Sequence, residues 1–442
     1  MTMERRIYWN DGWKFIESYE KEMREAAYQD DAWENVRLPH TCKETPLHYF
    51  DESSYQMECC YRKHFFAPLE WKDQTVIVTF EGIAHEADVF LNGEKIGEHH
   101  CGYTAFSIDI SGKLRTGAEN VLIVRVDSRE NLNIPPFGYV IDYMTYGGIY
   151  PEVYVDIKNR TYLADIFLHS EIPESQEAEV KLISEIKIRN SGKTDEKKEL
   201  SIRQSIKERG AEKYRQIGES RVASDGKISF PVPDVKLWNL ENPALYEVKT
   251  ELLQDGNVLD ENVTLFGFRK AVFLQDGFYL NDRKIKLCGL NRHQSYPYVG
   301  YAMPESMQKW DADILKNELG VNAVRTSHYP QSRHFVERCD ELGLLVFTEI
   351  PGWQHIGDEN WKKQAVENVK DMVVQYRNHP SVILWGVRIN ESGDDDAFYR
   401  ETNRVAHELD PTRQTGGVRA HKKSSLLEDV YTYNDFSHNG TN

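Results

Sequence analysis

Cysteine is scarce in this chain of 442 residues, which holds only six. They stand at Cys42, Cys59, Cys60, Cys101, Cys288 and Cys339. These positions follow neither the paired spacing of a metal site nor a disulfide framework. Two adjacent cysteines, Cys59 and Cys60, could not easily bridge one another. We therefore interpret all six as reduced thiols.

The chain also has fewer basic than acidic residues and no long apolar segment. The chain has 54 Lys and Arg against 71 Asp and Glu, and a formal net charge of −17. Such a surface repels nucleic-acid backbones and anionic membranes, so we expect no nucleic acid and no membrane as partner. No stretch reaches the ~20 apolar residues of a membrane span, and no apolar core follows the basic N-terminal residues as in a signal peptide. We expect a cytoplasmic protein with a neutral or small-molecule substrate.

The hydrophobic pattern changes twice along the chain and predicts three domains. Residues 1–158 carry short alternating runs, and the Asn92-Gly93 pair between two of them indicates a tight hairpin, so we expect an antiparallel β-sandwich. Residues 159–268 have a strand about every ten residues, as an immunoglobulin-like sandwich does. Residues 269–442 alternate strands with helices, which is typical of a (β/α) barrel or a doubly wound sheet.

Helical periodicity in the last domain appears at 306–320, 332–343, 361–380 and 397–411. Strands are expected near 284, 321, 344, 382, 413 and 429. The first helical pattern places Met307, Trp310, Ile314 and Leu315 on one apolar face. The chain shows no low-complexity segment and neither of the common glycine-rich phosphate motifs.

The strands of this domain begin apolar and end on polar side chains. These ends are Asn291, Arg292, His293, Arg325, Ser327, His328, Glu349, Asn390, Glu391, Asn434 and Asp435. In a barrel such ends converge on one mouth, where barrel enzymes carry their chemistry. One buried His or Glu has many explanations, but five strands that end alike have few.

Structural interpretations compete with the functional one at each position. Glu391 could cap the helix that follows it, and His328 could be a satisfied core histidine. Arg325 could be the buried partner of a carboxylate. Trp385 is more typical of a barrel core, whereas Trp353 follows a strand end and is the better candidate for a sugar platform.

Four segments resemble glycoside hydrolase family 2, which includes β-galactosidases, β-glucuronidases and β-mannosidases. Residues 322–347 and 377–391 are similar to its two signature regions, 90–110 to its jelly-roll domain and 289–294 to its first barrel strand. The resemblance implies a jelly roll, an immunoglobulin-like domain and a TIM barrel, in that order. Since a TIM barrel has eight strands and about six are recognised here, we expect an incomplete barrel.

Roles for individual residues follow from the same resemblance. Glu391 corresponds to the general acid/base, and Asn390 to the residue that contacts the sugar 2-hydroxyl. His328 corresponds to a histidine that contacts the glycone, and Arg325 to an arginine beneath the catalytic carboxylates. The strand ends at His293 and Glu349 line the same pocket.

A retaining glycosidase needs a second carboxyl group, roughly 5–5.5 Å from the acid. The family's nucleophilic glutamate ends the seventh strand, and no such strand is recognised in this sequence. Glu349 and Asp435 are the nearest substitutes, but neither has the motif, and we expect neither to serve. We therefore expect an N-terminal portion of a longer enzyme, with little or no activity alone.

The resemblance implies a retaining exo-β-glycosidase, in the first instance a β-galactosidase. A β-glucuronidase is the alternative within the family, and a non-catalytic carbohydrate-binding protein is the rival from another class. Some β-galactosidases of the family hold a metal through the third-strand carboxylate and a histidine just after it. Here no histidine follows Glu349 until His355, so we expect no metal and no other cofactor. Residues 142–150 resemble a segment that reaches from the jelly roll toward the barrel mouth. The sequence leaves open whether the protein forms a homo-oligomer.

Overall fold

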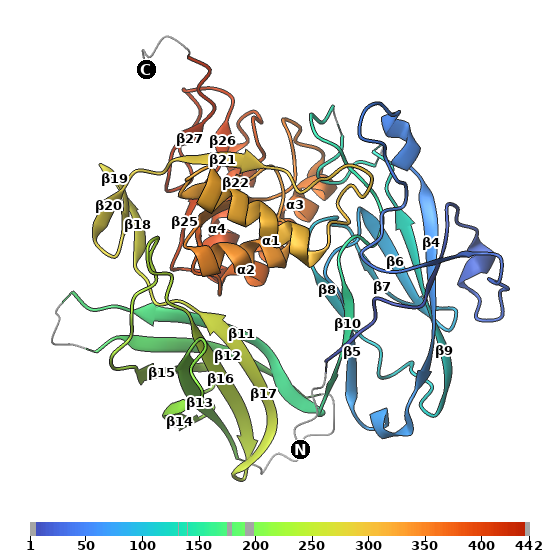
Figure 1. Cartoon of the computed structure of the whole chain (residues 1–442), viewed down its shortest axis with the longest axis horizontal. Helices are drawn as coiled ribbons and strands as arrows, with labels where there is room; N and C mark the ends of the chain where they lie inside the picture. The colour runs from blue at the N-terminus through green and yellow to red at the C-terminus, as the bar shows by residue number, and fades with distance from the viewer. Residues whose placement is uncertain (1–5, 131, 139, 175–178, 191–198, 438–442) are drawn as a thin grey trace.

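The computed structural model describes residues 6–130, 132–138, 140–174, 179–190 and 199–437. The two termini that the predicted first and last domains include, 1–5 and 438–442, lie outside these ranges. Three structural units follow one another along the chain. Figure 1 shows the N-terminal sandwich on the right, beside the helices of the third unit, and the second sandwich below the third unit and to the left of the lower part of the N-terminal sandwich. This arrangement agrees with the predicted fold class.

The first unit is a sandwich of two antiparallel sheets. One sheet has the order β3-β2-β4-β9-β6-β7, with strands Glu34–Val36, Trp13–Ile16, Glu58–Ala67, Ala118–Asp127, Glu86–Leu91 and Glu94–His99. The other has the order β1-β10-β5-β8, with strands Arg6–Tyr8, Val153–Lys158, Thr75–Phe80 and Phe106–Asp109. The β6–β7 hairpin turns at Asn92 and Gly93, whose φ angles of 54° and 93° are those a tight two-residue turn needs. The predicted hairpin is therefore confirmed.

The second unit is a smaller sandwich of the immunoglobulin-like kind. Its three-stranded sheet has the order β11-β12-β15, with strands Thr161–Glu171, Lys181–Asn190 and Lys227–Pro231. Its four-stranded sheet has the order β14-β13-β16-β17, with strands Arg215–Arg221, Leu200–Glu208, Tyr246–Gln254 and Asn257–Phe266. Inward residues such as Leu182, Ile202 and Val248 are buried between the sheets and form its core, as the alternation of apolar residues predicts.

The third unit contains a parallel sheet of five strands with helices packed against it. The strands, in chain order, are β21 Gly289–Arg292, β22 Ala323–Thr326, β23 Leu345–Glu349, β24 Val382–Gly386 and β25 Gln414–Gly416. The helices are α1 Glu305–Asp313, α2 Arg333–Leu342, α3 Glu359–Tyr376 and α4 Asp396–Leu409. A short antiparallel sheet precedes them, formed by β18 Ala271–Leu274, β19 Gly277–Leu280 and β20 Arg283–Ile285. This is part of a TIM barrel.

Two of the six expected barrel strands differ from the prediction. The region near 284 divides between β20, which belongs to the antiparallel sheet, and β21, which opens the parallel one. The expected strand near 429 is β27 Thr432–Tyr433, which pairs in parallel with β26 Val418–Arg419 outside the five-stranded sheet.

The expected buried face of the first helix is partly wrong. Leu315 is buried, but Trp310 is 59% exposed. Gln308 takes a buried position in α1 because its side-chain oxygen accepts a hydrogen bond from Arg292 Nη2 at 2.8 Å. Gln308 can therefore be buried although it is polar, because its hydrogen bond is satisfied. The spacing of the apolar residues alone does not predict this buried position.

Specific contacts hold the N-terminal sandwich against the barrel unit. Trp361 of α3 is fully buried, and its Nε1 donates to the carbonyl oxygen of Phe137 at 2.8 Å. His334 of α2 meets the carboxylate of Glu152 at 3.0 and 3.1 Å. These contacts bring the 142–150 segment to the barrel. In the part of the chain that the structure describes, no helix combines the length and hydropathy that a membrane crossing requires.

Candidate active site

Three neighbouring strands deliver polar side chains to one edge of the parallel sheet. β22 carries Arg325, and His328 follows two residues after its end. β23 ends on Glu349, and the segment after β24 carries Asn390 and Glu391. Because β22, β23 and β24 are adjacent and parallel, their carboxyl ends meet. The convergence expected from the sequence is therefore present for these three strands, whereas the Arg292 side chain turns to Gln308, Asp311 and Gln331 and Asp435 is exposed.

Arg325 joins the ends of all three strands. Its Nη2 donates to Glu349 Oε2 at 3.0 Å and to Asn390 Oδ1 at 2.7 Å, and its Nε also donates to Glu349. His328 Nδ1 lies 3.1 Å from the same Glu349 oxygen. Glu349 and Asn390 are only 1% and 2% exposed. The interpretation of Arg325 as a buried carboxylate partner thus holds, and the same contact orients Asn390.

Electrostatics fix the charge states in this cluster. Burial favours the neutral form of Glu349, but the Arg325 cation and the contact with His328 outweigh it and lower the pKa of Glu349. Burial lowers the pKa of His293 to about 4, and neighbouring His328 adds to this effect. His293 is therefore neutral at pH 7. Its Nδ1 lies 3.2 Å from the Tyr329 hydroxyl, and its ring is 5.6 Å from that of His328.

Glu391 has an unusual backbone conformation and a well-defined set of neighbours. Its φ of 54° is in the left-handed region, which costs a non-glycine residue on the order of 1 kcal/mol and is concentrated at functional sites. Gln354 Nε2 donates to its Oε2 at 3.0 Å, and Asn434 Nδ2 donates to its Oε1. The capping interpretation is wrong, because Asp395 caps α4 by accepting from the Phe398 N–H at 3.1 Å.

The N-terminal sandwich contributes two further residues to the site. Burial raises the pKa of Asp142, the negative charge of Glu391 raises it further and His328 opposes the shift. The ring of Tyr143 lies 5.2 Å from that of His293 and 5.9 Å from that of His328. The 142–150 segment was expected near the mouth, whereas the roles of Tyr143 and Gln354 were not anticipated.

Trp385 and Trp353 lie in different environments, as the sequence indicates. Trp385 is fully buried, and its Nε1 donates to Asp410 Oδ2 at 3.1 Å, so it belongs to the core. Trp353 is partly exposed, and its backbone pairs with that of Asn390, which places it beside the site. Its role as a sugar platform stays a prediction.

Within the described ranges, no group of three or more His, Cys, Asp and Glu side chains is arranged to hold a metal ion. Both oxygens of Glu349 are already engaged by Arg325, and one of them also by His328. The residues that are present do not fit a metal site around this carboxylate.

A cluster of carboxylate, amide and imidazole groups at the carboxyl ends of parallel barrel strands is the arrangement on which barrel enzymes build their chemistry. Comparison with known families agrees in all three units. Residues 17–158 match the sugar binding domain of glycosyl hydrolases family 2, residues 161–269 match glycosyl hydrolases family 2, and residues 272–438 match the family's TIM barrel domain. The chain belongs to glycosyl hydrolases family 2.

Individual relatives extend the match over the whole chain. A β-galactosidase of Thermoanaerobacterium thermosulfurigenes is 49% identical over 447 aligned residues, which cover 100% of this chain and 62% of the relative. A β-galactosidase of Thermoanaerobacter pseudethanolicus is 45% identical, over 98% of this chain and 58% of the relative. The crystal structure of a Bacteroides uniformis β-glucuronidase superposes with a TM-score of 0.84 at 27% identity, over 97% of this chain and 55% of that one. The chain thus spans about three fifths of the length of these proteins.

Proposed function

We propose that this protein acts as a retaining exo-β-glycosidase of the β-galactosidase type, with Glu391 as the general acid/base. The observation that carries the proposal is the placement of the Glu391 carboxyl between two amide donors, Gln354 and Asn434, next to the buried Asn390. The two β-galactosidase relatives, at 49% and 45% identity, support the choice of sugar.

The proposed chemistry has two steps. In the first, Glu391 donates its proton to the glycosidic oxygen while a nucleophilic carboxylate attacks the anomeric carbon, the C–O bond breaks and a glycosyl-enzyme forms. In the second, Glu391 takes a proton from water as the water oxygen displaces the carboxylate. The Asn390 side-chain oxygen is fixed by Arg325, which leaves the amide N–H group to donate to the sugar 2-hydroxyl in the proposed mechanism.

The described residues offer no good nucleophile, which supports the expectation of a second carboxyl group elsewhere in the longer enzyme. Glu349 is held by the Arg325 guanidinium and by His328, so it is not free to approach an anomeric carbon. Asp435 is exposed, and one of its oxygens accepts from the Ser437 N–H. We propose that this chain alone has little or no hydrolase activity.

The test of the acid/base uses Glu391→Gln in an enzyme extended at the C-terminus to the length of the relatives. Loss of the proton donor should slow the hydrolysis of alkyl β-galactosides by about 10²–10⁴-fold. Activated aryl β-galactosides, whose leaving group needs little protonation, should be slowed far less, and galactose should still bind. Glu367→Gln on α3 changes the same charge at an exposed position and serves as the control. If Glu391→Gln leaves alkyl galactoside turnover unchanged, Glu391 is not the acid.

A β-glucuronidase is the second candidate, because the Bacteroides uniformis β-glucuronidase has the same fold over 97% of this chain. Parallel assays of aryl β-galactoside and aryl β-glucuronide with the extended enzyme decide between them. The rival interpretation, a non-catalytic carbohydrate-binding protein, predicts sugar binding with no turnover of either substrate. A third assay, of the 442-residue chain beside the extended one, tests the dependence on a second carboxyl group; equal turnover by the two would contradict it.

A further inference from the structure

A buried group of charged side chains adjoins the segment that carries Glu391. Its centre is Glu428, whose side chain is completely buried between those of Arg388 and Arg419, both of them also completely buried. Glu428 Oε1 lies 3.6 Å from Arg388 Nη1, and its Oε2 accepts a hydrogen bond from Arg419 Nη2. Buried ion pairs often add no net stability over apolar packing, so this one calls for another explanation.

Asp394 balances the charge of this group. Arg388 Nη2 donates to Asp394 Oδ1, and Asp394 Oδ2 accepts from the backbone N–H of Ser425 at 3.2 Å. The guanidinium group of Arg388 also lies over the ring of Tyr399, at 4.4 Å from its centroid. Two cations and two carboxylates therefore offset one another. A group without net charge is suited to holding chain segments together and not to attracting a charged ligand.

Arg419 fixes the backbone of the two short strands that follow the five-stranded sheet. Its Nη1 donates to the carbonyl oxygens of Gly417 at 3.1 Å and Thr432 at 3.3 Å, and its Nη2 donates to that of Ser425 at 3.0 Å. One side chain thus joins β26, β27 and the loop between them, which Figure 1 shows in red near the top of the third unit. Glu428, through its contact with Nη2, holds the guanidinium group in place for these contacts.

The same two strands present two groups that contact Glu391. The backbone N–H of Glu391 donates to the carbonyl oxygen of Val418 in β26 at 2.8 Å. The Asn434 amide, which donates to Glu391 Oε1, follows directly after β27. Asn434 is itself held by its backbone N–H, which donates to the carbonyl oxygen of Arg419 at 3.0 Å. The place of the Asn434 amide therefore depends on the place of Arg419.

We propose that Glu428 is a positioning residue for the reaction, which holds the Asn434 amide against the Glu391 carboxyl. One of its guanidinium partners, Arg388, lies three positions before Glu391 in the same segment. The other, Arg419, holds the backbone of Asn434. The buried carboxylate thus joins the segment of the acid to the segment of its amide donor. This inference rests on the proposed function of Glu391, and it adds that catalytic geometry depends on residues behind the site.

Hydrolysis of alkyl and of activated aryl β-galactosides by the C-terminally extended enzyme tests the inference. Glu428→Gln keeps the shape of the side chain and removes its charge, so the Asn434 contact should loosen. We expect kcat/KM for the alkyl galactoside to fall by about tenfold. The aryl galactoside, whose leaving group needs little protonation, should be slowed by less than about threefold. The ratio of the two kcat/KM values is the readout, because partial unfolding lowers both equally.

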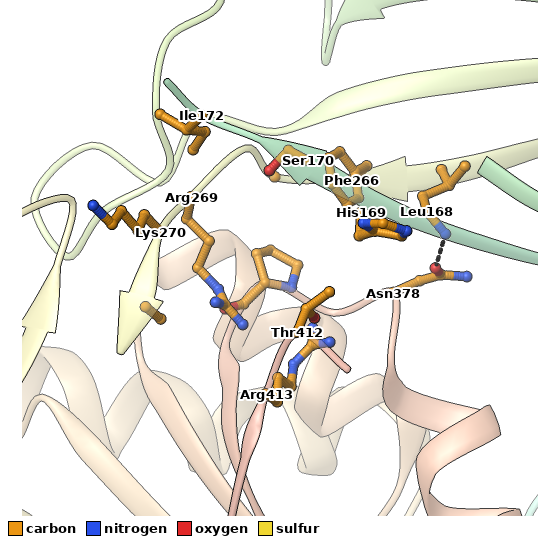
Figure 2. A pocket seen from close by; sticks show the side chains of 13 residues that line it. Leu168, His169, Ser170, Ile172, Phe266, Arg269, Lys270, Asn378, Thr412 and Arg413 are labelled. Atoms are coloured by element: carbon orange, nitrogen blue, oxygen red, sulfur yellow. Dashed lines mark hydrogen bonds between the residues drawn. The ribbon is translucent and has the colours of Figure 1, made fainter. Parts of the chain in front are cut away.

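Asp410→Asn is the matched control, since it removes the charge of another completely buried carboxylate of the barrel unit. Asp410 Oδ2 pairs with Arg413 Nη1 at 2.7 Å. Arg413 lines a cavity between the barrel unit and the immunoglobulin-like unit, where Figure 2 shows it below Thr412. This pair directly precedes β25 and so lies at the opposite end of the sheet from Glu391. Asp410→Asn should lower both rates by the same factor.

Two further variants keep the test decisive. Glu428→Asp retains the buried charge and takes the place of Glu428→Gln if the latter does not fold. Because Glu428 Oε1 is already 3.6 Å from Arg388, a side chain shorter by one methylene should lose this contact, and the alkyl-to-aryl ratio should fall by at least about threefold. Asn434→Ala should lower the ratio as Glu428→Gln does. In the double variant the ratio should stay close to that of Asn434→Ala, because both residues act through one contact.

The results separate this inference from the proposed function. If Glu391→Gln lowers the alkyl-to-aryl ratio but a folded Glu428 variant keeps the wild-type ratio, the positioning role is overturned and the proposed acid stands. Losses that multiply in the double variant would also overturn it, since Glu428 would then act independently of Asn434. An unchanged ratio in Glu391→Gln would contradict the proposed acid and, with it, the positioning role of Glu428.

Discussion

Arg325 and Asn390 lie 65 positions apart in the sequence, and they are joined by a 2.7 Å hydrogen bond from the Arg325 Nη2 to the Asn390 Oδ1. The same guanidinium holds the buried Glu349. One side chain therefore sets the positions of two neighbouring strand ends. Its removal would disturb both the charge balance of the barrel and the orientation of the amide that we propose contacts the sugar.

Arg325→Met should destabilise the chain strongly. Breaking a buried ion pair by removing one partner typically costs about 3–5 kcal/mol, because the remaining charge is left buried and unpaired. Arg400→Met, which removes one partner of an exposed pair with Asp396, should cost less than about 1 kcal/mol. Urea denaturation of the two variants measures the difference. A loss below about 1 kcal/mol in Arg325→Met would show that Glu349 does not depend on this partner.

The Glu349 contacts also predict sensitivity to acid. The folded pKa of Glu349 lies below its ordinary value of 4.5, so the folded state binds this proton less readily than the unfolded state. The resulting stability is fully present above the unfolded pKa and is lost as the pH falls through the folded pKa. Unfolding free energies measured from pH 6 down to pH 3 should therefore fall, and Glu349→Gln should show a shallower fall. If the unfolding free energies of the wild type and Glu349→Gln fall equally with pH, the lowered pKa of Glu349 does not contribute to the acid sensitivity.

Asp142→Asn should separate activity from stability. Asp142 is exposed enough that its replacement should change the free energy of unfolding by no more than about 0.5 kcal/mol. It nevertheless precedes Tyr143, whose ring lies 5.9 Å from that of His328, and the charges of Glu391 and His328 both act on it, so kcat/KM of the extended enzyme for β-galactosides should fall by about tenfold or more. Asp225→Asn, an exposed carboxylate in the immunoglobulin-like unit, is the control. If kcat/KM of Asp142→Asn equals that of the wild type, Asp142 of the N-terminal sandwich does not contribute to the active site.

Periodicity and strand-end chemistry were sufficient to predict the three units and the convergence of Arg325, His328 and Glu349. These features are local, since each depends on the pattern within one strand and on the rule that parallel strand ends meet. The prediction that Trp385 belongs to the barrel core is confirmed for the same reason. It lies in a β-branched, apolar run, and such a run is typical of a strand that is buried on both faces.

What could not be predicted depends on contacts between distant segments. The buried position of Gln308 is set by Arg292, and no apolar period reports it. The donation from Gln354 to Glu391 depends on the path of the loop after β23, whose backbone pairs with Asn390. The approach of Tyr143 to His293 depends on how two domains pack. Such relationships appear only in three dimensions.

Gln354→Ala tests whether Gln354 positions Glu391. Without the Nε2 donor, the Glu391 carboxyl would keep only the Asn434 contact and sample more orientations. A displaced catalytic group lowers kcat while substrate binding is retained. We expect kcat of the extended enzyme to fall by about tenfold with KM nearly unchanged, and Gln216→Ala on the exposed strand β14 to alter neither. A rise in KM at constant kcat would instead show that Gln354 binds the substrate.

The contact of His334 with Glu152 joins α2 to the N-terminal sandwich and gives this interface its own pH dependence. His334 is 7% exposed and lies 3.0 Å from Glu152. Burial opposes its protonation, but the hydrogen bond to Glu152 and the Glu337 carboxylate, 3.6 Å from Nδ1, outweigh burial and raise the pKa of His334 from 6.5 to about 9. Because the folded pKa is the higher one, the contribution to stability is complete below pH 6.5 and is lost as the pH rises toward 9.

The unfolding free energy of the wild type should therefore decrease by on the order of 2 kcal/mol between pH 6.5 and pH 9. His334→Gln cannot be protonated, so it should be less stable than the wild type at pH 6.5 and should converge toward it at pH 9. Denaturant titrations at pH 6.5, 7.5 and 9 give the three differences. His421→Gln, an exposed histidine near the end of the chain, should follow the wild-type curve throughout. A constant difference between His334→Gln and the wild type at all three pH values would mean that the ring packs at this interface without carrying a proton.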